Sequence, residues 1–302
     1  TQTTAVEITG AISAADLNTI ANNTAGAVTA TITAGTVAAT LAAISHVDGT
    51  AGNDKITYTT NQTTVDASDL VDLNAKVDTF NIASVTTITE AYNTVDLTTE
   101  VLAAEALKEG ANVEITGGAI SAANLNTLAS DTTIGNITAT ATETAAATLV
   151  GLTTTNTDMI TVTMASASTA AADLNTIDGK TGTAVNATAI TALTGAASDV
   201  KTALASTGIT TVTGSLAVNV SGNTSVADIN TINADTATGV VTATASETDA
   251  TTLVTLTTTS NDAITVTMAA ASTAATDLNT IDLATGTAVN ATAITALTGA
   301  AS

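Results

Sequence analysis

The chain has 302 residues with 27 acidic and five basic side chains, so its net charge is −22. This charge excludes binding to nucleic acids and to anionic membrane surfaces, because both need a cationic patch. The sequence has no Cys, which excludes disulfides and thiolate sites, and no apolar run reaches the length of a membrane span. Aromatic residues make up 1% of the chain, so its core must be built from Ala, Val, Ile and Leu.

A long internal repeat organises the chain. Residues 160–198 return almost unchanged as residues 264–302, at an offset of 104 residues. The sequence predicts one continuous domain over residues 1–302, with repeat units at about 1–110, 111–215 and 216–302, the last truncated. Because Ser302 occupies the position of Ser198, after which the repeat continues, we expect the chain to be part of a longer protein.

Short segments of alternating apolar and polar residues predict strands. In the strand near Ile160, we expect Ile160, Val162 and Met164 to face inward and Thr161 and Thr163 to face outward. The expected strands begin at Val6, Val28, Ile56, Phe80, Val113, Ile137, Ile160, Val185, Val218, Val241, Ile264 and Val289.

Apolar pairs at i and i+3, such as Leu174 and Ile177, follow the strands and predict short helical turns. Ser13 and Ser272 precede two of these turns, where a hydroxyl can cap the first N–H groups. Longer helices are expected at residues 97–108 and 196–206.

Together these signals predict a β-solenoid, similar to a parallel β-helix. Each coil of about 24–26 residues would hold one short strand and one short helical turn, with four coils in each 104-residue repeat. Neighbouring coils would bury their apolar residues against one another through parallel strands. A β-sandwich is disfavoured, because two-residue hairpin signals are missing.

The segment at residues 49–57, GTAGNDKIT, is the sharpest local motif. It resembles the calcium-binding nonapeptide of RTX proteins, with Thr50 in place of the second glycine. The resemblance implies a calcium site formed by Gly49, Gly52, Asn53 and Asp54. Calcium is the only cofactor that the sequence suggests, and we expect the chain to require no cofactor. The alternative is an Asp-containing turn that leads into a strand.

The wider pattern, in which A-D-L-N-T-I, T-A-T and T-V-T recur, resembles the Thr/Ala-rich repeats of giant surface proteins of marine bacteria, especially picocyanobacteria. This resemblance implies an extracellular or cell-surface location and a structural or adhesive role. It implies no catalytic residues.

We therefore expect a non-enzymatic structural segment that self-associates into a rod, fibre or sheath. An enzyme is disfavoured because near-identical repeats would duplicate any catalytic site, and His46 is the single histidine. The alternative function is an adhesin arm or binding module, acting through calcium-dependent adhesion or through ice binding by outward Thr columns. The sequence is also compatible with a carbohydrate or another surface ligand as a binding partner.

Overall fold

The computed structural model describes residues 3–49, 52–92, 97–131, 133–211, 215–236 and 238–299. Contacts between Cα atoms divide the chain into two compact units. Unit 1 comprises Thr1–Thr142 with Thr157–Ile160, and unit 2 comprises Glu143–Asn156 with Thr161–Ser302.

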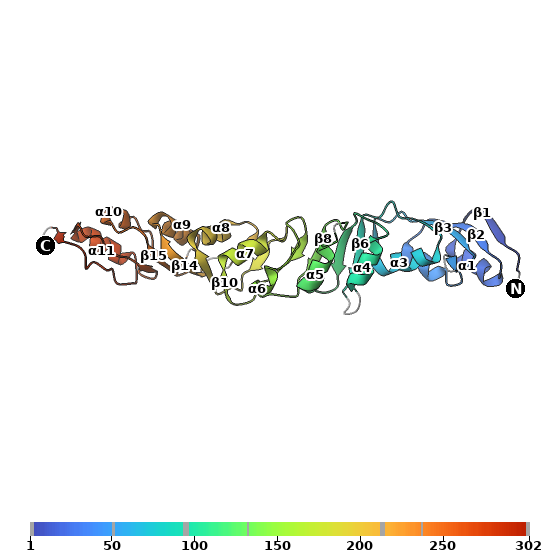
Figure 1. Cartoon of the computed structure of the whole chain (residues 1–302), viewed down its shortest axis with the longest axis horizontal. Coiled ribbons are helices and arrows are strands. Elements are labelled where there is room, and N and C mark those ends of the chain that lie inside the picture. The colour runs from blue at the N-terminus through green and yellow to red at the C-terminus, as the bar shows by residue number, and fades with distance from the viewer. Residues whose placement is uncertain are drawn as a thin grey trace. The chain divides into compact units, whose positions relative to one another are not determined.

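Unit 1 combines short strands with α-helices, several of which are labelled in Figure 1. Its elements are β1 (Val6–Ile12), α1 (Ala14–Asn23), β2 (Val28–Ile32), α2 (Val37–Ala43), β3 (Lys55–Thr59), β4 (Thr64–Asp66), α3 (Ala67–Lys76), β5 (Thr79–Asn81), β6 (Thr87–Ala91), α4 (Leu97–Glu105), β7 (Asn112–Thr116), α5 (Ala122–Ala129), β8 (Ile137–Thr140) and the first two residues of β9 (Met159–Thr161).

The strands of unit 1 form two parallel sheets, in the orders β1-β2-β3-β5 and β4-β6-β7-β8-β9. The register places inward residues of successive strands side by side, as in the pairs Val6 with Val28 and Ile88 with Val113. Helices α3 and α4 pack against each other and against β6 of the second sheet.

Unit 2 repeats this alternation. Its elements are α6 (Ala146–Leu149), β10 (Ser168–Ala170), α7 (Ala171–Asp178), β11 (Val185–Ala187), β12 (Ala192–Ala196), α8 (Ala197–Ala205), β13 (Ile209–Thr211), β14 (Ala217–Thr224), α9 (Val226–Thr236), β15 (Val241–Ala245), α10 (Ala250–Leu253), β16 (Ala263–Thr265), β17 (Ser272–Ala274), α11 (Ala275–Leu283) and β18 (Ala296–Thr298).

One five-stranded parallel sheet of order β10-β12-β14-β15-β16 dominates unit 2, beside the two-stranded sheets β11-β13 and β17-β18. Leu193 pairs with Val218 between β12 and β14, and both side chains are fully buried. The expected orientation of the strand near Ile160 is confirmed, since Val162 and Met164 are buried while Thr161 and Thr163 are exposed.

The prediction of a β-solenoid is wrong. The described residues form an α/β fold with five separate parallel sheets and 11 helices, not coils of one strand and one helical turn. Many of the apolar pairs lie in true α-helices, up to the 11 residues of α9. Thr-rich segments between strand and helix also form second strands in a different sheet, as β4 does after β3, because β-branched Thr favours extended backbone. The boundaries of the three repeat units stay a prediction.

The prediction that Ser13 caps a helix is confirmed, and the prediction that Ser272 caps a helix is wrong. Ser13 caps α1, because its hydroxyl accepts a hydrogen bond of 3.1 Å from the Asp16 N–H. Ser272 instead lies in β17, and α11 begins after Ala274, which makes no side-chain cap. The two longer expected helices are confirmed as α4 and α8, and each is shorter than expected by at most three residues. None of the described helices combines the length and hydrophobicity that a membrane crossing requires.

Candidate functional site at the Asp54 turn

The candidate calcium residues lie in a tight turn before β3, and both glycines are required there. Gly49 has a φ of 36°, and a Cβ at this position would collide with the backbone carbonyl of Lys76. A Cβ on Gly52 would collide with the carboxylate of Asp48. The Gly52 N–H donates to the Gly49 carbonyl over 3.1 Å, which closes the turn. Thr50 and Ala51 lie outside the described residues.

The Asp54 carboxylate is buried and is held by backbone N–H groups. Its Oδ1 accepts from the Val28 N–H at 2.8 Å, and its Oδ2 accepts from the Asp48 N–H at 3.3 Å. In return, Oδ1 of Asp48 accepts from the N–H groups of Asn53 and Asp54, each at 3.3 Å. The two aspartates therefore fix the turn and attach it to the first residue of β2.

Burial is the main reason that the pKa of Asp54 lies above its usual range. The negative charge of Asp48 raises the pKa further, while the hydrogen bonds from the backbone of Val28 and Asp48 lower it. The surroundings of Asp54 thus disfavour its ionised form, although its oxygens accept hydrogen bonds.

The same hydrogen bond recurs at the 104-residue interval. Oδ1 of Asp158 accepts from the Ile137 N–H at 2.8 Å, and Oδ1 of Asp262 accepts from the Val241 N–H at 2.9 Å. Both carboxylates are buried, as Asp54 is. Since Val28, Ile137 and Val241 are the first residues of β2, β8 and β15, each aspartate satisfies the first N–H of a strand. We call Asp54, Asp158 and Asp262 the strand-capping aspartates.

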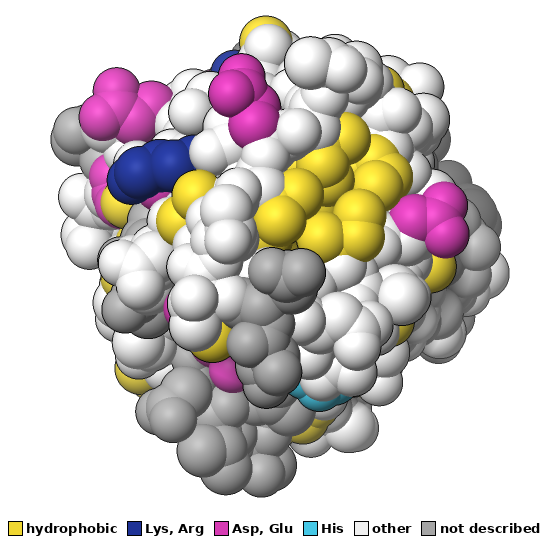
Figure 2. Space-filling view, turned by 90° about the vertical axis from the view of Figure 1, so that its right-hand side faces the viewer, with side chains coloured by type: hydrophobic (Ala, Val, Ile, Leu, Met, Phe, Trp, Pro, Cys, Tyr) yellow, Lys and Arg dark blue, Asp and Glu magenta, His cyan; other side chains and the backbone are white. Residues whose placement is uncertain are grey.

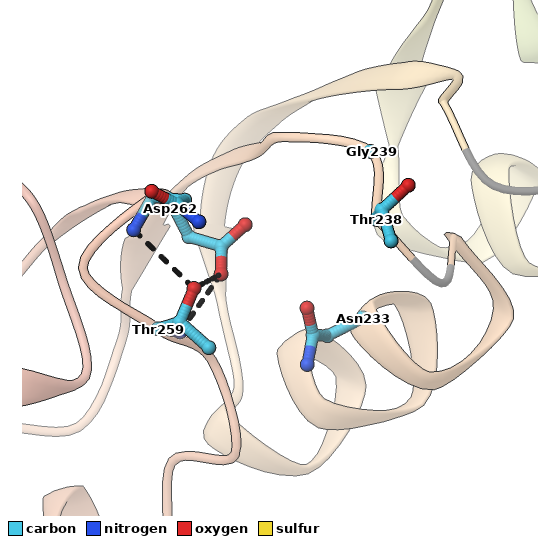
Figure 3. Close-up of a pocket in the computed structure, with 6 residues that line it drawn as sticks. Asn233, Thr238, Gly239, Thr259 and Asp262 are labelled. Carbon is cyan, nitrogen blue, oxygen red and sulfur yellow. Dashed lines mark hydrogen bonds between the residues drawn. The ribbon is translucent and has the colours of Figure 1, made fainter.

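A small polar cavity of about 250 Å³ lies beside the third strand-capping aspartate, within unit 2 (Figure 3). Asp262 and Thr259 form one wall, where Oδ2 of Asp262 accepts from the Thr259 N–H at 2.8 Å and from its hydroxyl at 3.2 Å. Asn233 and Thr238 lie across the cavity from them (Figure 3). The lining offers amide and hydroxyl groups to a small polar molecule, but both oxygens of its carboxylate already accept hydrogen bonds.

Calcium needs six to eight oxygen ligands. In the turn, Asp54, Asn53, Asp48 and the carbonyl groups of the two glycines are the oxygen donors closest in sequence. A set of three or more His, Cys, Asp or Glu side chains placed to hold a metal is absent from the described residues. Calcium at Gly49, Gly52, Asn53 and Asp54 therefore stays a prediction, whereas the alternative of an Asp-containing turn leading into a strand matches the observed geometry.

Sequence reasoning missed Asp48, which lies directly before the motif and shares its hydrogen bonds with Asp54. His46 is exposed, and its Nδ1 lies 3.1 Å from the Ser45 hydroxyl and 3.4 Å from the Asn18 side chain. The single histidine thus lies exposed in a turn after α2.

Comparison of the chain with protein-family models, with curated proteins and with solved structures finds no match.

Proposed function

We propose that this chain is a non-enzymatic structural repeat segment of a large extracellular or cell-surface protein, and that it self-associates into a fibre or array. One observation carries the proposal. Neighbouring repeats contact each other through the same strand pairing at the same register in both units.

The recurring contact joins the strand before the longer helix of one predicted repeat to the first strand of the next. In unit 1 it pairs Ile88 of β6 with Val113 of β7, and in unit 2 it pairs Leu193 of β12 with Val218 of β14. The sequences at Val113 and Val218 are variants of the sequence at Val6. The chain therefore contains a contact that binds one repeat to another copy of the same motif.

Among the described residues, both halves of this contact also occur in strands that pair with a single neighbouring strand. Val6 belongs to β1, which lies at the edge of its sheet, and Leu297, the repeat equivalent of Leu193, belongs to the edge strand β18. The Leu297 side chain is 59% exposed. Figure 2, which views unit 1 from the side of β1 and α1, shows a cluster of apolar side chains on this face. Val6 of β1 and Ile20 of α1 line one small pocket together.

Exposed strand edges with apolar flanks favour pairing with another chain. In a second copy, β18 could meet β1 with Leu297 opposite Val6, as Leu193 lies opposite Val218 within the chain. This contact is heterologous, so it generates a ring or an open filament. The net charge of −22 opposes it, and salt or calcium should strengthen it by screening.

Light scattering of the purified chain across a series of salt and calcium concentrations tests the proposal. We expect the mean mass to rise with ionic strength, and Leu297→Glu to suppress the rise. Val240→Glu is the matched control, because Val240 is also exposed, at 42%, and receives the same charge outside the proposed contact. A strict monomer at every salt and calcium concentration would contradict self-association.

A second candidate, an ice-binding or adhesive face, rests on a row of threonines in register. Thr31, Thr57 and Thr79 lie on neighbouring strands β2, β3 and β5, which are about 4.8 Å apart in parallel sheets. Such a row presents hydroxyl and methyl groups at regular intervals. Thermal hysteresis in the unmodified chain that is lost in Thr57→Leu would favour ice binding. If the unmodified chain shows no thermal hysteresis, ice binding is ruled out. Calorimetric titration with calcium tests calcium-dependent adhesion in the same way, because no heat at millimolar calcium leaves the turn as a purely structural feature.

A further inference from the structure

Glu90 occupies an inward position of strand β6 in unit 1, on the same face of the strand as the core residue Ile88. The side chain of Ile88 is fully buried, and Glu90 is only 4% exposed. Glu90 pairs in register with Ile115 of β7. A carboxyl group at such a position needs a reason, because burying an acid is costly.

Unit 2 shows that this position does not need a carboxyl group. There the equivalent residue is Gly195, two positions after Leu193 and paired with Val220. A Cβ at Gly195 would lie 3.7 Å from the Cβ of Ala171, so helix α7 begins directly against this point of the sheet. In unit 1, helix α3 likewise packs on β6, and the backbone of its second residue, Ser68, hydrogen-bonds to the Glu90 carboxyl group.

Among the described residues, one oxygen of the Glu90 carboxyl group has no hydrogen-bond partner. Its Oε2 is buried and has no partner among the described residues, although the backbone of Ser68 and of Ala91 hydrogen-bonds to the carboxyl group. Asp66 at the start of α3 and Glu100 in the first turn of α4 are the charges that act on it. Both charges are negative, so neither compensates an ionised Glu90.

The remaining charged groups on the elements around β6 are also mostly acidic. Lys76 lies in the last turn of α3, about 15 Å along the helix from Asp66. Glu114 of β7 is exposed, and Glu105 of α4 is buried, where it accepts from the Gly110 N–H and the Thr133 hydroxyl. The titratable and charged side chains on these elements are Asp66, Asp69, Asp72, Lys76, Glu100, Glu105 and Glu114.

We propose that Glu90 is a pH switch that controls how tightly helices α3 and α4 pack on strand β6. In the protonated form, the carboxyl group is neutral and stays buried without the cost of a desolvated charge. In the ionised form, a negative charge lies in a dry site beside Asp66 and Glu100, and the helices must open to admit water. A metal ion is not proposed here, because three suitably placed metal-ligating side chains are not found among the described residues.

The charge change falls in the neutral range. Burial is the largest cause that raises the pKa of Glu90 to about 7, followed by the negative charges of Asp66 and Glu100. Because the folded state holds the proton more tightly than the unfolded state, closure of the helices is most favoured below the ordinary pKa of 4.5 and weakens as the pH rises from there through about 7.

Hydrogen exchange of the whole chain tests the switch. Between pH 5 and pH 8, after correction for the intrinsic exchange rate, we expect protection of the amides in α4 and β6 to fall on the order of 100-fold. Glu90→Gln is neutral at every pH, so protection should stay high in that variant. Glu114→Gln removes an exposed carboxylate on the neighbouring strand and should keep the pH dependence.

Equal pH profiles in the unmodified chain and in Glu90→Gln would overturn the proposal. Loss of the pH dependence in Glu114→Gln would overturn it as well. If Glu90→Gln does not fold, Glu90→Gly reproduces the residue of unit 2 at this position. The titration of the Glu90 carboxyl carbon by NMR in the unmodified chain gives an independent answer. A midpoint near 7 supports the switch, and a midpoint near 4.5, the ordinary value, overturns it.

Discussion

Removal of a strand-capping aspartate should destabilise the fold far more than removal of an exposed capping aspartate. In Asp262→Ala, the Val241 N–H loses its acceptor at 2.9 Å, and the Thr259 N–H loses its acceptor at 2.8 Å. Asp262 is 4% exposed, so water does not easily replace the carboxylate at the Val241 N–H. An unsatisfied buried N–H costs about 1–3 kcal/mol, so the variant should lose about 2–5 kcal/mol of stability.

Hydrogen exchange at the Val241 amide is the direct assay, since unfolding of a two-unit chain need not follow a two-state transition. Asp249→Ala is the matched control. It removes the same charge from unit 2 together with hydrogen bonds to the Thr252 N–H and the Thr251 hydroxyl, but Asp249 is exposed at the start of α10. The Val241 amide should exchange much faster in Asp262→Ala and at its normal rate in Asp249→Ala. Equal exchange rates in the two variants would refute the structural role of the strand-capping aspartates.

Three further changes have expected outcomes. Leu174→Asp places a charge in the core of unit 2 and should lower the stability by several kcal/mol, as measured by thermal unfolding. Thr163→Ser changes an exposed position and should lower the stability only slightly. Equal shifts of the unfolding temperature in the two variants would contradict the assignment of Leu174 to the core and of Thr163 to the surface. Gly52→Ala should destabilise the turn by about 1–3 kcal/mol, because its Cβ collides with the Asp48 carboxylate; an unchanged denaturation midpoint would contradict this close contact. Stability should fall by about 2–3 kcal/mol as the pH rises from 5 to 8, because the raised pKa of Glu90 favours the folded state only while the group holds its proton. Denaturant titrations at each pH measure this change, and a stability that rises over the same range would have the wrong sign.

Local patterns in the sequence predicted much of the local structure. The alternation at Val162 and Met164 gave the correct inward face, and Ser13 gave a correct helix cap. The capping prediction failed at Ser272, because a Ser-Thr-Ala segment forms a strand as readily as a cap when a neighbouring strand pairs with it. The fold class failed for a related reason, since strand segments as short as Thr64–Asp66 carry too little periodicity to be counted.

The role of Asp54 depends on a contact between residues far apart in the sequence, which local sequence patterns do not predict. Asp54 accepts from Val28, 26 residues earlier, so no local motif distinguishes this capping role from a ligand role. Glu90 is a buried carboxyl group because its position in β6 faces the core of the unit. The difference from Gly195 becomes visible once the register aligns each residue with its partner, Ile115 or Val220.

Disulfide trapping tests the proposed contact between copies most directly. The chain has no natural Cys, so a variant with Val6→Cys and Leu297→Cys carries thiols only at the proposed pairing. Strands that pair as β12 and β14 do lie about 4.8 Å apart, within the range of about 4.4–6.8 Å between Cα atoms that a disulfide spans. Under mild oxidation at high salt, we expect a ladder of covalent oligomers on a non-reducing gel, and little ladder when Val240→Cys replaces Leu297→Cys. A monomer band alone at all salt and calcium concentrations, or equal ladders from both pairs, would contradict the account.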